Sequence, residues 1–322
     1  MNRDSGATAP VIWLITDNKA GHRNQLRGLG NRLRVLAGAD LHWINATDYP
    51  TPMWRALTGI APASVPNLPA PALIIGAGSG THRLLLALRR YRKAKTLVLM
   101  KPGFPLRLVD AAIIPAHDKV KPARNILITE GVINAVTPLA RLTSKPEALV
   151  LIGGPSQHYD WHDDAILSQL GDLMARYPEW RWTITNSRRT PKALSDRLSE
   201  LQGPRISVVD HNQTHEGWLN HQLASSRAVW VTPDSQSMVC EAVTSGVPTG
   251  LLDLSPRSGS RVANGVEQLA KKGLLAHWAD HASIMAEQPE RHDRLWEADR
   301  AGRWVMQIFL GKYQNKDGER TR

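Results

Sequence analysis

The chain alternates short apolar runs with polar loops and with stretches that carry an apolar residue every three or four positions. Runs that are apolar throughout are typical of strands buried on both faces of a parallel sheet, and the longer periodic stretches are typical of helices packed on it. The alternation therefore predicts an α/β protein with doubly wound, mostly parallel sheets. The predicted strands are residues 11–16, 41–44, 73–75, 96–100, 112–114 and 126–129, then 148–152, 182–185, 206–209, 228–231 and 249–252.

The predicted elements fall into two series, because the alternation breaks in a polar, proline-containing stretch at residues 137–147. A chain of 322 residues is comfortable as two domains, and such a stretch is typical of a boundary between them. We expect a first Rossmann-like domain over 1–140 and a second over 141–288. Residues 289–311 are expected to form a C-terminal helix, and 312–322 a disordered polar tail.

The net charge and the cysteine count of the chain limit the kinds of ligand and partner that we expect. The net charge is +11, which favours an anionic substrate, an anionic membrane surface or nucleic acid. Nucleic acid ranks lowest, because the basic residues are scattered and no known nucleic-acid motif occurs. A single cysteine excludes an intrachain disulfide and a cysteine-based metal site. The amino-terminal residues lack an apolar signal core, and no apolar run approaches the roughly 18 residues that span a membrane. We expect a location in the cytoplasm, which includes peripheral association with the inner face of the membrane.

The stretch 228–248 is the most informative of the second domain. Ala228–Val231 reads as a buried strand, and Asp234 and Ser235 are both suited to cap the helix that follows. Thr232, Ser235 and Ser237 therefore stand where a strand's carboxyl end meets a helix amino end. Free backbone N–H groups and the positive end of the helix dipole make this junction a common phosphate site. Glu241, farther along the helix, is placed to reach ribose hydroxyls. A capped strand–helix unit without a ligand is the alternative.

In the first domain, the loop after the first strand reads AspAsnLysAlaGlyHisArgAsnGln. Asp17 and His22 are candidate general bases, and His22 is favoured. A plain turn is the alternative. The other candidate residues of this loop are Lys19, Gly21, Asn24 and Gln25.

Other strand ends carry glycines and cations. GlyAlaGlySerGly at 76–80, with Gly78 and Ser79, lacks the spacing of a dinucleotide fingerprint and is expected to be a close-approach loop. Lys101 is either a charge near phosphate or a solvated lysine. In the second domain, the candidate donor-binding residues at strand ends also include Gly153, Gly154, Ser187, Arg188, Arg189 and Asp234. Either arginine could clamp an anion. No AspXxxAsp pattern occurs, so Asp234 is interpreted as a helix cap and no metal site is expected.

Three of these motifs resemble one family. ThrProAspSerGlnSerMet followed by GluAla, the loop at 17–25, and SerArgArgThrPro at 187–191 are similar to the mitochondrial fission ELM-type proteins. That resemblance implies a GT-B-like fold in which two domains face a cleft, with the donor on the second domain and the acceptor on the first. It also implies that the last helix crosses back to the first domain.

The resemblance implies a metal-independent glycosyltransferase that moves sugar from a nucleoside-diphosphate sugar, without a cofactor, to an anionic or membrane-associated acceptor such as a lipid-linked or cell-envelope glycan. Two alternatives stay open: a non-catalytic scaffold of the same fold, and an NAD-dependent nucleotide-sugar epimerase, which the missing fingerprint disfavours.

Overall fold

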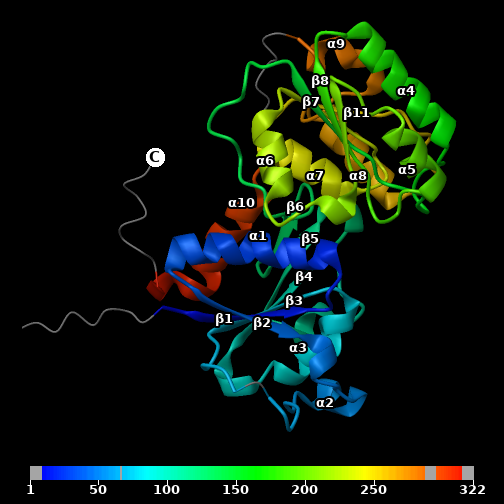
Figure 1. The fold of residues 1–322 in the computed structure, drawn as a ribbon. Helices are drawn as coiled ribbons and strands as arrows, with labels where there is room; N and C mark the ends of the chain where they lie inside the picture. Colours follow the sequence, from blue (N-terminus) through cyan, green and yellow to red (C-terminus); the bar gives the residue numbers. More distant parts are fainter. Residues whose placement is uncertain (1–8, 66, 287–294, 314–322) are drawn as a thin grey trace, which may run out of the picture. The chain divides into compact units, whose positions relative to one another are not determined.

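The computed structural model describes residues 9–65, 67–286 and 295–313 and divides into two compact units. The first unit takes in the described residues up to Ala135 and again from Glu297, and the second is Val136–Trp296. The tail expected at 312–322 lies almost wholly outside the described residues, as does the expected helix start at Pro289. Each unit is a parallel sheet with helices on both faces (Figure 1).

The first unit's sheet has the strand order β2-β1-β3-β4-β5-β6. Its strands match the apolar runs of the sequence: β1 (Val11–Thr16), β2 (Asp40–Asn45), β3 (Leu73–Ala77), β4 (Lys95–Leu99), β5 (Ala111–Pro115) and β6 (Ile126–Thr129). All pair in parallel. The order reverses between β1 and β3, which is where α/β sheets of this kind open a crevice at their carboxyl edge.

Helices cover both faces of this sheet. Helix α1 (Ala20–Ala37) packs on the face of Leu14, where a Cβ on Gly30 would lie 3.1 Å from the Leu14 side chain. Gly28 allows a second close approach, to the segment after β6, because a Cβ there would lie 2.1 Å from the carbonyl oxygen of Asn134. Helix α2 (Met53–Thr58) and helix α3 (His82–Leu88) lie on the other face, where Trp13 and Ile74 are buried. The predicted helix 81–92 ends early, at Leu88, and a separate short turn follows over Tyr91–Lys93, where Arg92 and Lys93 adopt positive φ.

The C-terminal segment also belongs to the first unit. Helix α10 (Glu297–Val305) continues as a π-helical turn over Met306–Leu310. It packs against α1, where Arg32 forms an ion pair with Asp299 and a Cβ on Gly302 would lie 3.0 Å from that of Arg32.

The second unit's sheet has the order β11-β10-β7-β8-β9, and it reverses between β7 and β10. Its strands are β7 (Glu147–Leu151), β8 (Arg181–Thr185), β9 (Ile206–Val209), β10 (Ala228–Val231) and β11 (Thr249–Leu251). Its helices are α4 (Asp163–Arg176), α5 (Lys192–Ser199), α6 (Trp218–Ser225), α7 (Gln236–Ser245), α8 (Arg261–Lys271) and the short α9 (His281–Ile284). Trp180, Trp182 and Trp230 fill one face of the sheet, together with leucines of α4 and α5.

Candidate functional site

The carboxyl ends of β7, β8 and β10 bring together a loop cluster in the second unit, at the point where the strand order reverses. Backbone N–H groups of the β7 loop donate to side chains of the β10 loop: Gly153 to Thr232 Oγ1 at 2.8 Å and Gly154 to Asp234 Oδ2 at 3.2 Å. The loop after β8 joins them, because Ser187 Oγ donates to the Gly153 carbonyl at 2.9 Å. The sequence predicted these residues, and the structure brings them together.

The two glycines of this loop cluster are required by close packing. A Cβ on Gly153 would lie 2.3 Å from Asp234 Oδ1, and one on Gly154 would lie 2.1 Å from the Arg189 carbonyl oxygen. Both distances are far shorter than any real contact, so a larger residue would force the loops apart. The glycines thus allow the β10 side chain and the β8 backbone to lie directly on the β7 loop.

Asp234 plays a different part from the one predicted. Its side chain is fully buried, and its Oδ2 accepts from Arg189 at 2.6 Å as well as from Gly154. Helix α7 begins after Ser235, which makes no side-chain capping bond. The interpretation of Asp234 as a helix cap is therefore wrong. Its carboxylate faces the β7 and β8 loops because the buried charge is compensated there.

The guanidinium of Arg189 forms hydrogen bonds within the protein. Besides Asp234, its guanidinium donates to the carbonyl oxygens of Gly154 and Pro155. Its charge is thus paired with that of the buried Asp234 carboxylate. Arg188 is exposed, and among the described residues it has no hydrogen-bond or ion-pair partner. Of the two predicted clamp residues, Arg188 is the one whose charge is uncompensated.

The amino end of α7 remains accessible. Ser235, Ser237 and Glu241 are all half-buried, whereas Thr232 is fully buried beneath them. One buried oxygen near this end, Asp234 Oδ1, has no partner among the described residues.

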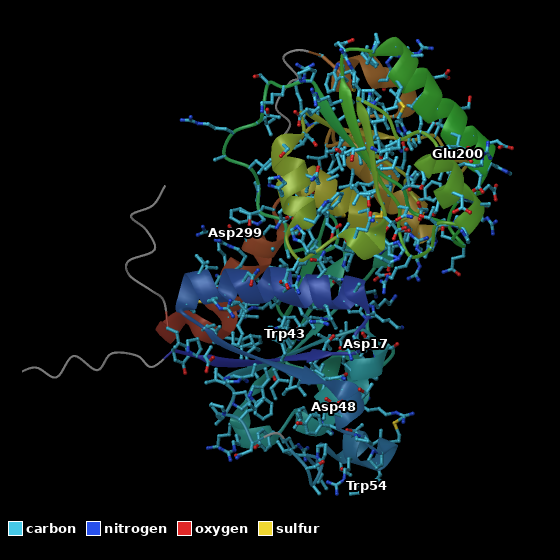
Figure 2. All side chains as sticks on the ribbon, in the orientation of Figure 1. Asp17, Trp43, Asp48, Trp54, Glu200 and Asp299 are labelled. Atoms are coloured by element: carbon cyan, nitrogen blue, oxygen red, sulfur yellow. The ribbon has the colours of Figure 1, made fainter. Side chains whose placement is uncertain are left out.

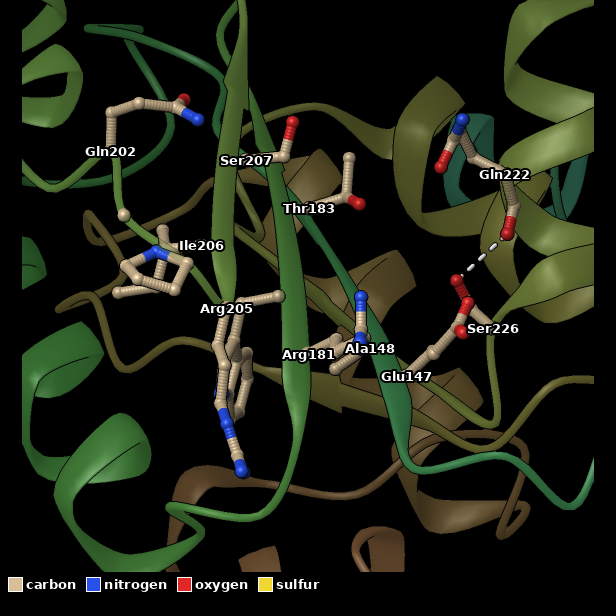
Figure 3. A pocket seen from close by; sticks show the side chains of 13 residues that line it. Glu147, Ala148, Arg181, Thr183, Gln202, Arg205, Ile206, Ser207, Gln222 and Ser226 are labelled. Atoms are coloured by element: carbon tan, nitrogen blue, oxygen red, sulfur yellow. Dashed lines mark hydrogen bonds between the residues drawn. The ribbon is translucent and has the colours of Figure 1, made fainter.

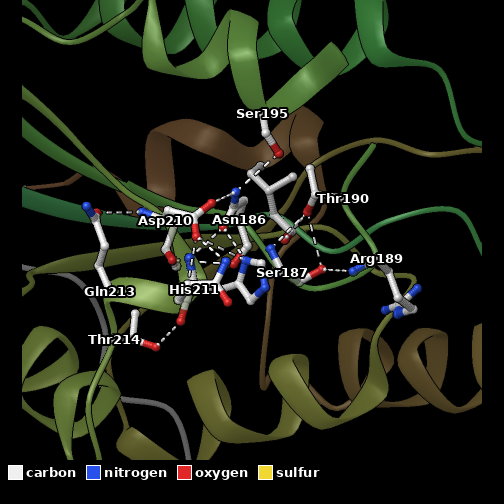
Figure 4. Close-up of polar contacts among 12 residues, drawn as sticks. Asn186, Ser187, Arg189, Thr190, Ser195, Asp210, His211, Gln213 and Thr214 are labelled. Carbon is white, nitrogen blue, oxygen red and sulfur yellow. Dashed lines mark hydrogen bonds and ion pairs between the residues drawn. The ribbon is translucent and has the colours of Figure 1, made fainter. Parts of the chain in front are cut away.

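Hydrogen bonds to neighbouring segments hold the β8 loop in place, and three of the residues that form them, Asn186, Asp210 and His211, were not among the sequence candidates (Figure 4). Asn186 donates to Asp210 at 2.8 Å and accepts from the backbone N–H of His211 at 2.7 Å. The hydrogen bond from Asn186 lowers the pKa of the Asp210 carboxyl. Thr190 donates to the Gly153 carbonyl and accepts from Ser187 N–H. Their spacing gives no sign of this network, because its partners come from separate strands.

The first unit carries a second group at the carboxyl ends of β1 and β3. His22 Nδ1 lies 2.8 Å from Asp17 Oδ1, and a Cβ on Gly78 would lie 2.1 Å from the same ring nitrogen. Gly78 has a φ of 89°, which is a glycine conformation. The carboxylate holds Nδ1 as the donor, so the lone pair of the ring is on Nε2, as a general base requires. Asp17 Oδ2 is buried and has no partner among the described residues.

The other predicted loop residues of the first unit have structural contacts. Gln25 is buried and its amide contacts Met100 sulfur at 3.3 Å, and Asn24 accepts from Ala135 N–H at 3.3 Å. Lys101 donates to the Asp118 carbonyl at 3.2 Å. Lys19 stands at the N-cap of α1, and Gly21 and Ser79 lie in the first turns after β1 and β3. Beside this loop, burial lowers the pKa of His82, while Asp17 opposes that shift.

Two pockets in the second unit were not predicted. One, of about 360 Å³, lies beside Pro233 and is lined by apolar side chains such as Tyr159, Leu252 and Trp278 and also by the polar residues Asp253, Asn264, Glu267 and His277. The other, of about 250 Å³, lies at the amino ends of β7, β8 and β9, the opposite edge of the sheet, and includes Arg181 (Figure 3). The described residues contain no group of three or more His, Cys, Asp or Glu placed to hold a metal ion, and no described helix meets the length and hydropathy needed to span a membrane.

Comparisons with solved structures find the same fold at low identity. A putative UDP-N-acetylglucosamine 2-epimerase from Listeria monocytogenes is 12% identical, with a TM-score of 0.60 over 94% of this chain and 97% of that one. The MnaA–UDP structure from S. aureus is 12% identical, with a TM-score of 0.53 over the same shares. The UDP-GlcNAc 2-epimerase from Neisseria meningitidis bound to UDP-GlcNAc is 12% identical, with a TM-score of 0.51 over 94% and 99%.

These similarities confirm the predicted fold of two Rossmann-like α/β domains of the GT-B type. A comparison with curated proteins found no significant match. The model of the mitochondrial fission ELM1 family matches residues 20–309, which is most of the chain. The match includes two of the motifs quoted above in full and residues 20–25 of the loop at 17–25. The chain therefore belongs to the mitochondrial fission ELM1 family.

Proposed function

We propose that this protein binds a nucleoside-diphosphate sugar in its second unit, with the diphosphate at the amino end of α7. One observation carries the proposal: the glycine loop of β7, the arginine loop of β8 and the start of α7 converge at the reversal point of the sheet. That is where α/β sheets bind phosphates, because helix N–H groups point there and the helix dipole is positive. The MnaA structure with UDP and the Neisseria epimerase with UDP-GlcNAc have the same fold, which supports this ligand class.

Each residue of the loop cluster has a different role in the proposed binding of the ligand. Arg188 supplies the uncompensated positive charge for the diphosphate, and Ser235 and Ser237 supply hydroxyl groups at the helix start. Glu241 accepts hydrogen bonds from ribose. Arg189 and Asp234 keep the loops in register rather than contacting the ligand. The pocket beside Pro233 is the proposed place for a less polar part of the ligand.

We further propose that the reaction is glycosyl transfer, with His22 taking a proton from the acceptor hydroxyl. The supporting observation is the Asp17–His22 pair, whose geometry leaves Nε2 as the proton acceptor. No metal or cofactor is assigned to this proposal, since Arg188 and the α7 dipole are the groups that would stabilise the leaving diphosphate. The acceptor is proposed to be anionic or membrane-associated, and the location cytoplasmic or on the inner membrane face, because the chain is strongly basic.

Thermal shift against a panel of nucleoside diphosphates, nucleotide sugars and NAD tests the binding step. A bound nucleotide raises the melting temperature, because it stabilises only the folded state. We expect the rise with one class of diphosphate to disappear in Arg188→Ala and to weaken in Glu241→Ala. Arg176→Ala is the matched control, because this exposed arginine ends α4 at the opposite edge of the sheet.

Three results would redirect the proposal. A folded protein that responds to no nucleotide would favour the non-catalytic scaffold, and stabilisation by NAD alone would favour the NAD-dependent nucleotide-sugar epimerase. With a stabilising nucleotide sugar in hand, product analysis separates the chemistries. Release of the free nucleotide with an acceptor present supports transfer, whereas an epimeric sugar still bound to the nucleotide would replace transfer by epimerisation.

A further inference from the structure

Helix α2 of the first unit and the residue after its C-cap expose four large apolar side chains. Met53, Trp54 and Leu57 lie on one face of the helix, and Ile60 follows its C-cap glycine. They are 52%, 52%, 67% and 50% exposed, so each presents at least half of its side chain to solvent. The opposite face is buried, since Ala56 is only 1% exposed and packs toward α3. We call these four side chains the α2 patch. Clustered exposure of this kind marks an interaction surface, unlike single exposed leucines.

Arginines surround the α2 patch. Arg89 donates to the carbonyl oxygens of Ala56 and Leu57, and Arg90 donates to that of Thr58, so both guanidinium groups stand at the carboxyl end of α2. Arg55 stacks on the Trp54 ring, 4.6 Å from its centroid. The apolar side chains therefore emerge among positive charges that are held in place by the backbone.

The sequence around the α2 patch is one-sided in charge. Between Tyr49 and Val109 it contains nine Lys and Arg residues and no Asp or Glu. Arg90, Arg92 and Lys93, at the end of α3, are exposed. A protein partner would need an equally one-sided acidic surface with an apolar centre. An anionic bilayer has both features everywhere on its surface: negative headgroups, and an apolar interior just beneath them.

We propose that the α2 patch docks the protein on an anionic lipid surface. Trp54, Leu57 and Ile60 enter the boundary between headgroups and acyl chains, while Arg55, Arg90 and Arg92 contact lipid phosphates. Trp is well suited to this boundary because its ring is amphipathic. This inference deepens the proposed function, since it names the surface by which the first unit would meet a membrane-associated acceptor. Figure 2 shows Trp54 at the far end of the first unit from Asp299 on α10.

Vesicle co-sedimentation without nucleotide tests the proposal, so its outcome does not depend on donor binding. We expect the wild-type chain to bind phosphatidylcholine vesicles containing phosphatidylglycerol, to bind pure phosphatidylcholine weakly, and to dissociate as salt rises. Trp54→Ser and Leu57→Ser should each lower the partition coefficient about tenfold, because each removes an apolar side chain from the bilayer. Arg90→Gln and Arg92→Gln should each lower it about fivefold.

Val35→Ser is the matched control, since Val35 is also an exposed apolar residue of the first unit, at 60%, but lies on α1. It should leave binding unchanged. All substitutions are at exposed positions, and circular dichroism checks that each variant is folded. The proposal is overturned if anionic vesicles do not bind the wild-type chain at low salt, or if Leu57→Ser binds as well as Val35→Ser. A concentration-dependent self-association that Leu57→Ser abolishes, without vesicle binding, would make the α2 patch an interface between two copies instead.

Discussion

The ion pair between Arg189 and Asp234 should act as a single unit in stability. The Asp234 side chain is 0% exposed, and Arg189 is 43% exposed. Removing one partner of a buried pair costs about 3–5 kcal/mol, because a charge is left unpaired in the interior. Water can reach the site of the arginine, so we expect Arg189→Met to cost about 3 kcal/mol, at the low end of that range.

The partner and double variants complete a thermodynamic cycle. Asp234→Asn leaves a half-solvated arginine and removes charge-assisted hydrogen bonds, so its expected cost is about 1.5 kcal/mol. The double variant has no unpaired buried charge and should cost about 3 kcal/mol, well below the roughly 4.5 kcal/mol of an additive pair, which leaves a coupling of about 1.5 kcal/mol. Arg188→Met, exposed and unpaired among the described residues, should change stability by less than about 0.5 kcal/mol.

Urea unfolding followed by circular dichroism measures these four free energies. The chain has two units, so transitions that separate are fitted separately and the one that shifts is compared between variants. Costs that add to within about 0.5 kcal/mol would refute the argument, because independent sites behave in that way. A cost for Arg188→Met equal to that for Arg189→Met would show that the assignment of the two arginines is reversed.

Three further changes test the packing and the electrostatics. Gly154→Ala should destabilise the second unit by about 2 kcal/mol or more, because its Cβ would lie 2.1 Å from a backbone carbonyl of the β8 loop; unaltered urea midpoints would contradict this. Gly250→Ala should shift the near-UV circular dichroism of Trp230, whose ring lies 2.5 Å from the new Cβ, and an unchanged spectrum would argue against that contact. Burial lowers the pKa of His82 below the usual 6.5, so the unfolded chain binds the proton more readily, and stability should fall as pH drops below about 6.5 and level off above it. His82→Gln should flatten that slope between pH 5 and 7, and equal slopes in both proteins would assign the effect to another group.

The sequence by itself determined the strands and the positions of the loops. The strands of the described residues were predicted from short runs such as Val11–Thr16 and Ala228–Val231, which are apolar because they are buried on both faces of the sheet, whereas the edge strand β2 is polar at Asp40, His42 and Asn45. The same runs locate the loops at their carboxyl ends, and with them Gly153, Ser187 and Asp234. The sequence predicted the ends of helices less well than the strands. The helix predicted at 81–92 stops at Leu88, and the positive φ of Arg92 beyond it depends on surroundings that the local sequence does not specify.

Only the tertiary structure decided which residues meet. Arg188 and Arg189 are adjacent, chemically identical and both exposed, yet only Arg189 is paired with a carboxylate, 45 positions away. Local propensity favoured Asp234 as a helix cap, but the buried charge has a stronger partner in Arg189, and long-range electrostatics overrides a local capping bond. Exposure of Leu57 likewise depends on which face of α2 packs against α3. The pattern of apolar and polar residues along the chain determines whether a segment forms a strand, a helix or a loop. The tertiary contacts that bury some side chains and leave others exposed determine the role of each side chain.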